Sequence, residues 1–362
     1  MKRTISLLFL VAFAGCLTAY PQKKEAPERQ GWYSEEFGSL YGDVESVNIT
    51  YYTLVDKFGE IVKEKVDRKC IYRFNSKGDV VECCSYNSDG SLNEEQLSKY
   101  DSQGNEIEYA KYNRYGTPEW KNFYKYDSQG NKIEHAHYNG DGSLHSKYLY
   151  KYDSQGNTIE EAWYKGDGSL EEKAFCKYNA HGKISEKNYY NRYDSLIYQT
   201  VYEYDSHGNL TFEAGYDNSG FDGERRLRHQ HSFEYDSHGN VIGWEEMCSS
   251  LSTSHYLQHR YTYDAQGHMI EETLEYEKEL VYNKTLYEYD SKGNVIKIAE
   301  YKNDIDPLRL KYDVSYDYKK CTLSKTTVIK YDAQGNWIEK IEYKSDIMIP
   351  VEMEERTIIY RK

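Results

Sequence analysis

The sequence is poor in the residues that usually build a hydrophobic core. Leu, Ile, Val and Phe together make up about 19% of its 362 residues, and Phe and Trp contribute 10 and 5 residues. With a formal net charge of −14, a share of these four residues below roughly 20% is typical of disordered chains. A folded domain is therefore excluded unless another residue type supplies the buried surface.

Tyrosine supplies that surface, because the chain contains 41 of these residues. Each tyrosine can bury a ring of roughly 150 Å² while its hydroxyl keeps a hydrogen-bond partner. Aromatic side chains also suit the half-buried, pleated surface of a sheet. The composition therefore favours an all-β fold.

Long apolar runs are missing beyond the N-terminus, since no segment after residue 16 approaches the roughly 18 apolar residues of a membrane helix. The N-terminal run from Ile5 to Gly15 follows Lys2 and Arg3, and it is too short to span a bilayer. This arrangement is typical of a signal peptide, here residues 1–15, and predicts an exported protein.

The segment Phe13-Ala14-Gly15-Cys16 resembles a bacterial lipobox, in which the cysteine is the lipid attachment site. We therefore expect lipid on Cys16, membrane contact through that anchor alone, and a tether over residues 16–41. Such an anchor would hold the protein at the cell envelope, facing the periplasm or the cell surface. A plain secreted form, cleaved after Ala14, is the alternative.

Acidic residues exceed basic ones by 60 to 46, and removal of Lys2 and Arg3 with the signal peptide takes the net charge from −14 to about −16. A surface of that sign repels phosphate backbones, so nucleic acid is not expected as a partner. The charge suits a body held outside the inner membrane.

Six of the seven cysteines remain once Cys16 is set aside, in a compartment where disulfides persist. If Asn75 to Gly78 forms a hairpin turn, Cys70 lies opposite Cys84 or, with a longer loop, opposite Cys83. A cross-strand disulfide of Cys70 with Cys84 or Cys83 is therefore a hypothesis. The alternative is that these cysteines are small, buried, apolar side chains.

The dominant signal is a 26-residue repeat in the central half of the chain. In its motifs an Asp or Asn bonds its own backbone and a Gly takes the left-handed position, which is turn chemistry. The stretches of about eight residues between turns are rich in Tyr, Ile and Thr, which is typical of strands. Tyr-Asp-Ser/Ala-x-Gly-Asn begins at Tyr100, Tyr126, Tyr152, Tyr204, Tyr235, Tyr289 and Tyr331, and a second motif, such as Tyr138-Asn-Gly-Asp-Gly-Ser, lies between the early copies.

Because the chain reverses at each turn, the two turn types should line opposite edges of one antiparallel sheet. This predicts a β-hairpin repeat domain over residues 42–362, regular over 70–210 and irregular over 211–362. Open sheets beyond about 10 strands coil or close. We therefore expect a long antiparallel meander in an elongated, strongly twisted or spiralling sheet, and the sequence leaves undecided whether the spiral stays open or closes.

The phase of the side chains is ambiguous. Tyr124 and Tyr126 share one face, whereas Ile133 is out of phase with Ala136 and Tyr138. Either a bulge follows each turn or both faces of the sheet bury rings. The pattern fits both alternatives.

The Tyr-Asp-x-x-Gly-Asn copies, which cover most of residues 70–345, resemble the YD repeats of the RHS family. The closing stretch from Tyr331 to Tyr360 looks like the end of short exported repeat proteins common in the Bacteroidetes. The resemblance implies spirals of β-strands, a cell-surface location and, as proposed for some members, carbohydrate binding. The sequence lacks the Asp-Pro-rich core segment and the toxin domain of large members, so a toxin-carrying shell and self-cleavage are not implied.

Candidate metal ligands lack a complete pattern. His135-x-His137 and His229-x-His231 each place two imidazoles on one strand face, but no third ligand is specified. The run from Asn139 to Ser143 resembles the start of a calcium loop, but Tyr150 stands where an acidic residue is needed. We therefore expect no metal and no cofactor.

Catalytic motifs are missing as well. Carboxylate doublets such as Glu160-Glu161, Glu171-Glu172 and Glu271-Glu272 point to opposite faces of a strand and cannot flank one bond. The sequence has no nucleophile elbow, no zinc-protease motif and no phosphate-binding glycine loop. We expect no catalytic residue, and a carbohydrate-active enzyme is the weakest alternative.

Binding and structural support are then the competing functions. In the first, rows of exposed Tyr and Trp stack on sugar rings or on a partner's peptide. In the second, the rings are packing elements and the protein is a passive scaffold. We expect an exported envelope protein that binds a protein or glycan partner, with the insertions as candidate loops. The tryptophans are Trp120, Trp163, Trp244 and Trp337, and the insertions are residues 220–230, 248–259 and 302–324.

Overall fold

The computed structural model describes residues 40–58, 60–218, 224–249, 254–276, 280–303, 321–344 and 349–361. The predicted signal peptide, the lipid attachment site at Cys16 and the tether up to residue 39 lie outside the described residues, as do parts of the three insertions. Among the residues that the structure describes, no helix is long and apolar enough to cross a membrane.

The described residues form 22 β-strands that follow the predicted repeat. Their bounds are β1 (Val44–Lys57), β2 (Glu60–Phe74), β3 (Val80–Asn87), β4 (Leu92–Tyr100), β5 (Glu106–Asn113), β6 (Pro118–Tyr126), β7 (Lys132–Asn139), β8 (Leu144–Tyr152), β9 (Thr158–Lys165), β10 (Leu170–Tyr178), β11 (Ile184–Asn191), β12 (Leu196–Tyr204), β13 (Leu210–Asp217), β14 (Arg226–Tyr235), β15 (Val241–Ser249), β16 (Ser254–Tyr263), β17 (Met269–Tyr276), β18 (Leu280–Tyr289), β19 (Val295–Lys302), β20 (Thr322–Tyr331), β21 (Trp337–Lys344) and β22 (Ile349–Tyr360).

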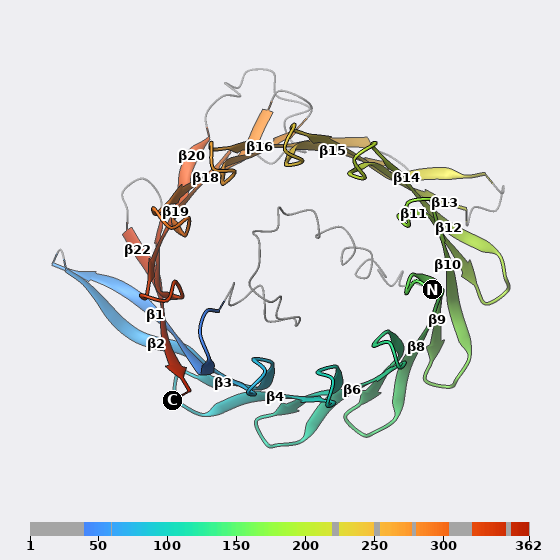
Figure 1. Ribbon diagram of the computed structural model, residues 1–362. Coiled ribbons are helices and arrows are strands. Elements are labelled where there is room, and N and C mark those ends of the chain that lie inside the picture. The colour runs from blue at the N-terminus through green and yellow to red at the C-terminus, as the bar shows by residue number, and fades with distance from the viewer. Residues whose placement is uncertain are drawn as a thin grey trace, which may run out of the picture.

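Each strand pairs antiparallel with its neighbours in sequence, and β1 also pairs with β22. Val47 lies opposite Ile358 and Asn48 opposite Thr357, so the first and last strands close the sheet. The result is a ring of strands, which we call the cylinder (Figure 1). The expected elongated, spiralling sheet is therefore wrong. Twist and coiling bring the two ends of the meander together, and closure pairs the edges that an open sheet would expose.

The turns have the predicted chemistry. After β4, the Gly104 amide donates to the Asp101 carbonyl at 3.2 Å, and Gly104 adopts a φ of +98°. Asp101 Oδ1 accepts a hydrogen bond from the Asn105 amide at 2.9 Å. In the second turn type, Asp141 Oδ1 accepts one from the Ser143 amide at 2.9 Å. Because the two types alternate along the regular part of the meander, each lines its own rim of the cylinder there.

A bulge after the Tyr-Asp turn sets the side-chain phase. Tyr126 lies opposite Lys132 and Lys125 opposite Glu134, so Ile133 is an extra residue in β7. The same register shift recurs in other hairpins of this type. The bulge, one of the two alternatives left by the sequence, is thereby confirmed.

The segment before β1, residues 40–43, lies on the inner side of the ring (Figure 1). Leu40 packs there with Val47, Ile49 and Tyr72, so these side chains point into the cylinder. The pairing of each strand with the next shows which side chains of the other strands point the same way. By this criterion, the tyrosine of each Tyr-Asp motif also lies on the inner face. The outer face holds cross-strand ion pairs: Lys99–Glu108, Lys125–Glu134, Lys151–Glu160, Lys177–Glu186 and Lys330–Glu339.

The tyrosine that begins a turn of this type joins most of these hairpins to the one before. The Tyr126 hydroxyl donates to the backbone carbonyl of Glu106, the first residue after the preceding Tyr-Asp turn, at 2.8 Å. Such a hydrogen bond contributes about 1 kcal/mol net. Much of the high tyrosine content therefore serves to hydrogen-bond one hairpin to the next. Equivalent bonds come from Tyr100, Tyr152, Tyr178, Tyr235, Tyr263, Tyr289 and Tyr331.

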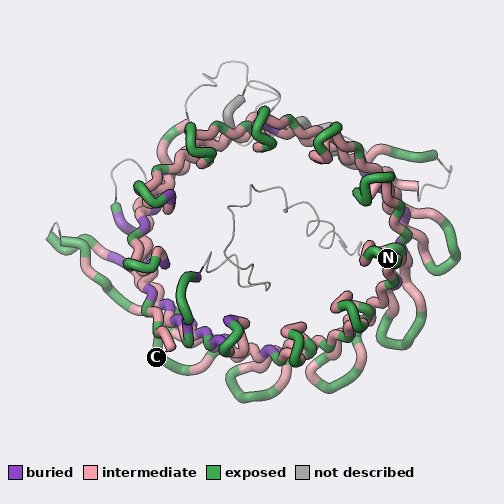
Figure 2. Tube along the Cα trace, viewed as in Figure 1, coloured by how far each residue is buried: buried purple, intermediate pink, exposed green. Residues whose placement is uncertain are grey.

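The best-buried part of the cylinder is the seam where its first and last strands meet (Figure 2). Asn336 has 0% exposure there, and its Nδ2 donates to the Tyr41 carbonyl at 3.0 Å and to Tyr360 Oη at 2.8 Å. Around the rest of the described cylinder most side chains in the strands are half-buried. A single-layered sheet covers its faces chiefly through contacts between neighbouring strands.

The register predicted for the cysteines is wrong. Cys70 lies opposite Ser85 rather than Cys84 or Cys83, because the bulge after the turn shifts β3 by one residue. Cys70 and Cys84 therefore point to opposite faces, and the Cys84 thiol donates to Glu82 Oε1 at 3.2 Å. This geometry removes the basis for a Cys70–Cys84 disulfide. Cys70 and Cys83 share a face and are buried at the seam, and a bridge across that diagonal stays a prediction.

Candidate functional site

The inner face carries four aromatic rings across β6 to β9, which we call the aromatic row: Tyr124, His135, Tyr148 and Trp163. Each ring lies opposite the next on paired strands. Ring centroids are 4.9 Å apart for the first pair, 5.6 Å for the second and 6.1 Å for the third, and the third pair is nearly parallel at 6°. The row is half-buried, so it forms a platform on the concave side of the sheet.

Polar groups accompany the aromatic row. Asn122 Oδ1 lies 3.1 Å from His135 Nε2 and 2.8 Å from His137 Nδ1. Lys187 Nζ donates to both carboxylate oxygens of Glu161 at 2.9 Å. Trp163 Nε1 is buried and has no hydrogen-bond partner among the residues that the structure describes. Hydrogen-bonding groups and ring faces therefore occur together on this surface.

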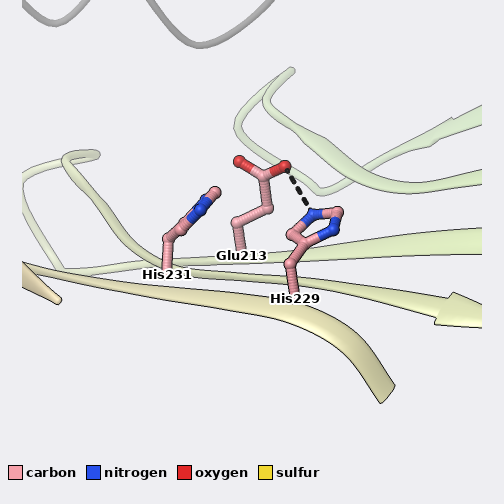
Figure 3. Close-up of side chains that lie close together, drawn as sticks. All are labelled: Glu213, His229 and His231. Carbon is pink, nitrogen blue, oxygen red and sulfur yellow. Dashed lines mark ion pairs between the residues drawn. The ribbon is translucent and has the colours of Figure 1, made fainter. Parts of the chain in front are cut away.

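A second group consists of Glu213 from β13 with His229 and His231 from β14, whose side chains lie close together (Figure 3). The strand register places it on the same inner face as the aromatic row. We call it the Glu-His-His cluster. One ligand atom from each side chain lies within 4.8 Å of the others, and His229 Nε2 is 3.6 Å from Glu213 Oε1. The strand register produces this arrangement, because Glu213 lies opposite His231 and Gly215 opposite His229.

Gly215 makes room for His229. A Cβ at this position would lie 2.3 Å from His229 Cε1 and 2.0 Å from Tyr198 Oη, so both side chains would have to move to admit any residue larger than glycine. In the space that glycine leaves, Tyr198 Oη lies 3.0 Å from His229 Nδ1. That contact fixes the imidazole so that its other nitrogen, Nε2, faces Glu213.

His231 lies between carboxylates and aromatic rings. Its Nε2 is 3.8 Å from Glu246 Oε1. Burial alone would lower the pKa of His231, but Glu213 and Glu246 outweigh burial and raise it to about 9. Trp244 meets the His231 ring edge-on at 5.5 Å and stacks on His259 at 4.0 Å. Burial lowers the pKa of His259 to about 4, so neighbouring imidazoles on this face differ in charge at neutral pH.

The two histidine pairs found in the sequence have different surroundings. The structure adds a third ligand group, Glu213, to His229 and His231, which the sequence analysis missed. His135 and His137 instead share the amide oxygen of Asn122. Glu213 could have been found only by aligning β13 against β14, since it is the inward-facing carboxylate opposite the second histidine.

The other candidates keep their structural roles. Asp141 accepts hydrogen bonds from the backbone and hydroxyl of Ser143, as turn chemistry requires. Glu160 pairs with Lys151 on the outer face, whereas its neighbour Glu161 points inward. Trp120, Trp163 and Trp244 contribute to inner-face ring contacts, and Trp337 belongs to the core of the seam.

A second set of ligand-type side chains, Glu82, Cys84 and Glu95, lies on the outer face. Burial and the Glu82 carboxylate raise the pKa of Cys84 to about 11. The thiol therefore holds its proton at neutral pH and is a weaker metal ligand than a neutral imidazole.

Residues 221–346 match the family model described as Teneurin YD-shell, and no curated protein sequence matches the chain. Among solved structures, the TcdB2-TccC3-Cdc42 complex resembles the chain at 13% identity and a TM-score of 0.31, over 80% of this chain and 19% of that one. A Photorhabdus luminescens Tc holotoxin pore resembles it at 11% identity and a TM-score of 0.27, over 82% and 20%.

A porin-like protein from Bacteroides uniformis resembles the chain at 9% identity and a TM-score of 0.27, over 88% of this chain and 99% of that one. The chain spans about a fifth of the length of the Tc toxin chains that it matches. The repeated Tyr-Asp turns and the match of residues 221–346 to this family model show that the chain contains YD (RHS) repeats.

Proposed function

We propose that the chain is a non-catalytic, exported protein of the cell envelope that binds a glycan on its inner face. The observation that carries the proposal is the aromatic row, whose rings lie side by side on a half-buried surface. Binding sites for small polar ligands combine aromatic surfaces with a few well-placed polar groups. The apolar faces of sugar rings suit such a platform.

The polar groups beside the row support this ligand class. Asn122 and the Glu161–Lys187 pair offer acceptors and donors beside the row. Sugar hydroxyls can satisfy both kinds of group. Export to the envelope rests on the predicted signal peptide and on Cys16 as the predicted lipid attachment site.

The test is a glycan array probed with the purified chain and with a Tyr148→Ala, Trp163→Ala double variant. Phe175→Ala is the matched control, because Phe175 is 37% exposed on the outer face. We expect the double variant to lose at least about tenfold in affinity, by analogy with the stacking of a nucleic-acid base on an aromatic side chain, which is worth roughly 1–3 kcal/mol. Binding that survives the double variant would refute the inner-face site.

A protein partner and a passive scaffold are the remaining candidates, and the same preparation separates them. One outcome of a pull-down from envelope extracts is the capture of one protein that the double variant no longer binds and that Phe175→Ala still binds. That result would identify the ligand of the inner face as a protein rather than a glycan. Silence in both assays would favour the scaffold. For lipid attachment, a Cys16→Ala chain that stays membrane-bound would count against the anchor.

A further inference from the structure

We propose that Glu213, His229 and His231 form a zinc site on the inner face of the cylinder. The three side chains offer two imidazole nitrogens and one carboxylate oxygen, all within 4.8 Å of one another. Two histidines and a carboxylate, with a fourth position open, are a donor set that zinc uses in proteins. The site is independent of the proposed glycan binding.

The separation of two of the donors, on His229 and Glu213, suits the ion. His229 Nε2 and Glu213 Oε1 are 3.6 Å apart, which is longer than an ordinary hydrogen bond. Two ligands bound tetrahedrally at roughly 2.0–2.1 Å from zinc lie about 3.3 Å from each other. A contraction of a few tenths of an ångström therefore allows both atoms to bind one ion.

The surroundings of His229 orient it as a ligand. Tyr198 Oη contacts the Nδ1 atom of His229 at 3.0 Å, and Gly215 leaves the space in which this contact forms. With the proton on Nδ1 and donated to Tyr198, the lone pair of Nε2 faces Glu213. A hydrogen bond to the non-ligating nitrogen is the usual way in which proteins hold a metal-binding histidine.

The charge of the site also suits a divalent cation. Glu246 Oε1 lies 3.8 Å from His231 Nε2, so a second carboxylate is within reach of the ion. Two carboxylates and two neutral imidazoles balance the charge of Zn²⁺. The competing occupant of the same space is a proton, held on His231 between Glu213 and Glu246. A metal ion would use the His229 nitrogen as well, which faces Glu213 at 3.6 Å.

The three ligands come from paired strands rather than from a loop. Glu213 is directly opposite His231, and His229 follows on the same face of β14. Backbone hydrogen bonds between β13 and β14 therefore fix the positions from which the ligands project, and such preorganisation favours binding. The other histidine pair, His135 and His137, has an amide oxygen in place of a carboxylate, which makes it a matched control.

The experiment uses the full chain, purified without a histidine tag and stripped of metal with EDTA. Zinc is titrated at pH 7.5 in competition with a chromogenic chelator, and Co²⁺ is titrated as a spectroscopic probe. We expect one zinc per chain and a visible Co²⁺ spectrum without the intense sulfur-to-cobalt band that a thiolate ligand gives. Glu213→Gln and His229→Gln should each weaken zinc binding by more than tenfold, and Tyr198→Phe by about tenfold.

The controls are His135→Gln and Cys84→Ser, both of which should bind zinc like the unaltered chain. Circular dichroism without metal checks that each variant folds. If His229→Gln does not fold, Glu213→Gln still tests the proposal, because glutamine has the same shape as glutamate. Less than one equivalent of bound zinc would overturn the proposal. So would unchanged affinity in Glu213→Gln, or an equal loss in His135→Gln.

Discussion

The hydroxyl of Tyr126 donates a hydrogen bond of 2.8 Å to the backbone carbonyl of Glu106, and the tyrosine and the carbonyl belong to successive Tyr-Asp hairpins. Burial and the nearby carboxylates of Glu106 and Asp101 raise the pKa of Tyr126 to about 12, so the hydroxyl keeps its proton at neutral pH. The tyrosine of the Tyr-Asp motif therefore links successive hairpins through a hydrogen bond.

Tyr126→Phe should lower the free energy of unfolding by about 1 kcal/mol, because it removes the donor and leaves the Glu106 carbonyl without this bond. Urea denaturation followed by circular dichroism measures the change. Tyr115→Phe is the control, since Tyr115 is 77% exposed in a turn. Equal stability of the two variants would show that the Tyr126 bond contributes nothing net.

Asn336→Ala should cost more than the same change at an equivalent turn position elsewhere. Asn336 is fully buried and bonds Tyr41 and Tyr360 across the seam, whereas Asn131 bonds Asp127 within its own turn. We expect a loss of about 2–3 kcal/mol for Asn336→Ala and about 1 kcal/mol for Asn131→Ala. Urea midpoints of the two variants, measured side by side, check the difference, and a larger loss at Asn131 would contradict it.

Stability should fall between pH 6.5 and pH 4, in part through His135. Burial, reinforced by Lys132 and His137, lowers the pKa of His135 from 6.5 to about 4. Below pH 6.5 His135 is protonated in the unfolded chain, whereas in the folded chain it stays neutral down to about pH 4. The neutral His135 therefore makes its full contribution to the free energy of unfolding above pH 6.5, and this contribution is lost as the pH falls toward 4.

The matching variant is His135→Gln, which should lose less stability than the unaltered chain between pH 7.5 and pH 5. The difference should be of the order of 1 kcal/mol after allowance for solvent screening. His207→Gln, at an exposed turn position, serves as the control and should follow the unaltered chain. Urea denaturation at the two pH values gives the result, and parallel losses in His135→Gln and His207→Gln would rule out the assignment.

Gly215→Ala should destabilise the chain by about 1–3 kcal/mol, because the added methyl group overlaps the Tyr198 hydroxyl and the His229 ring. Displacement of His229 should also weaken zinc binding. Gly243→Ala is a milder comparison, since its nearest contact would be 3.1 Å away. Thermal unfolding and zinc titration of both variants would show whether the overlap matters, and equal behaviour would argue that it does not.

The turns and strands were predictable because their causes are local. Asp101, Gly104 and Asn105 build a turn from four or five consecutive residues, and the pattern between turns fixes strand length. The bulge was foreseen as one of two alternatives, and it decides which side chains face inward. The same bulge misled the cysteine prediction, because one extra residue moves Cys70 from Cys84 to Ser85.

Closure and the Glu-His-His cluster were not predictable, because both depend on residues distant in sequence. Tyr41 and Asn336 meet although 295 positions separate them, and no pattern within one repeat specifies that contact. Glu213 joins His229 and His231 only through the register of β13 against β14, which contains a shift next to Gly215. Sequence spacing across an irregular connection does not reveal such a shift.

The pairing of β1 with β22 imposes a parity rule on the evolution of this chain. In a meander whose neighbours all run in opposite directions, the first and last strands are antiparallel only when the number of strands is even, as it is with 22. Gain or loss of a single strand would bring the ends together in parallel and misalign the seam bonds of Asn336. Duplication or deletion of a whole 26-residue unit preserves the alternation, so such proteins should change circumference in steps of two strands.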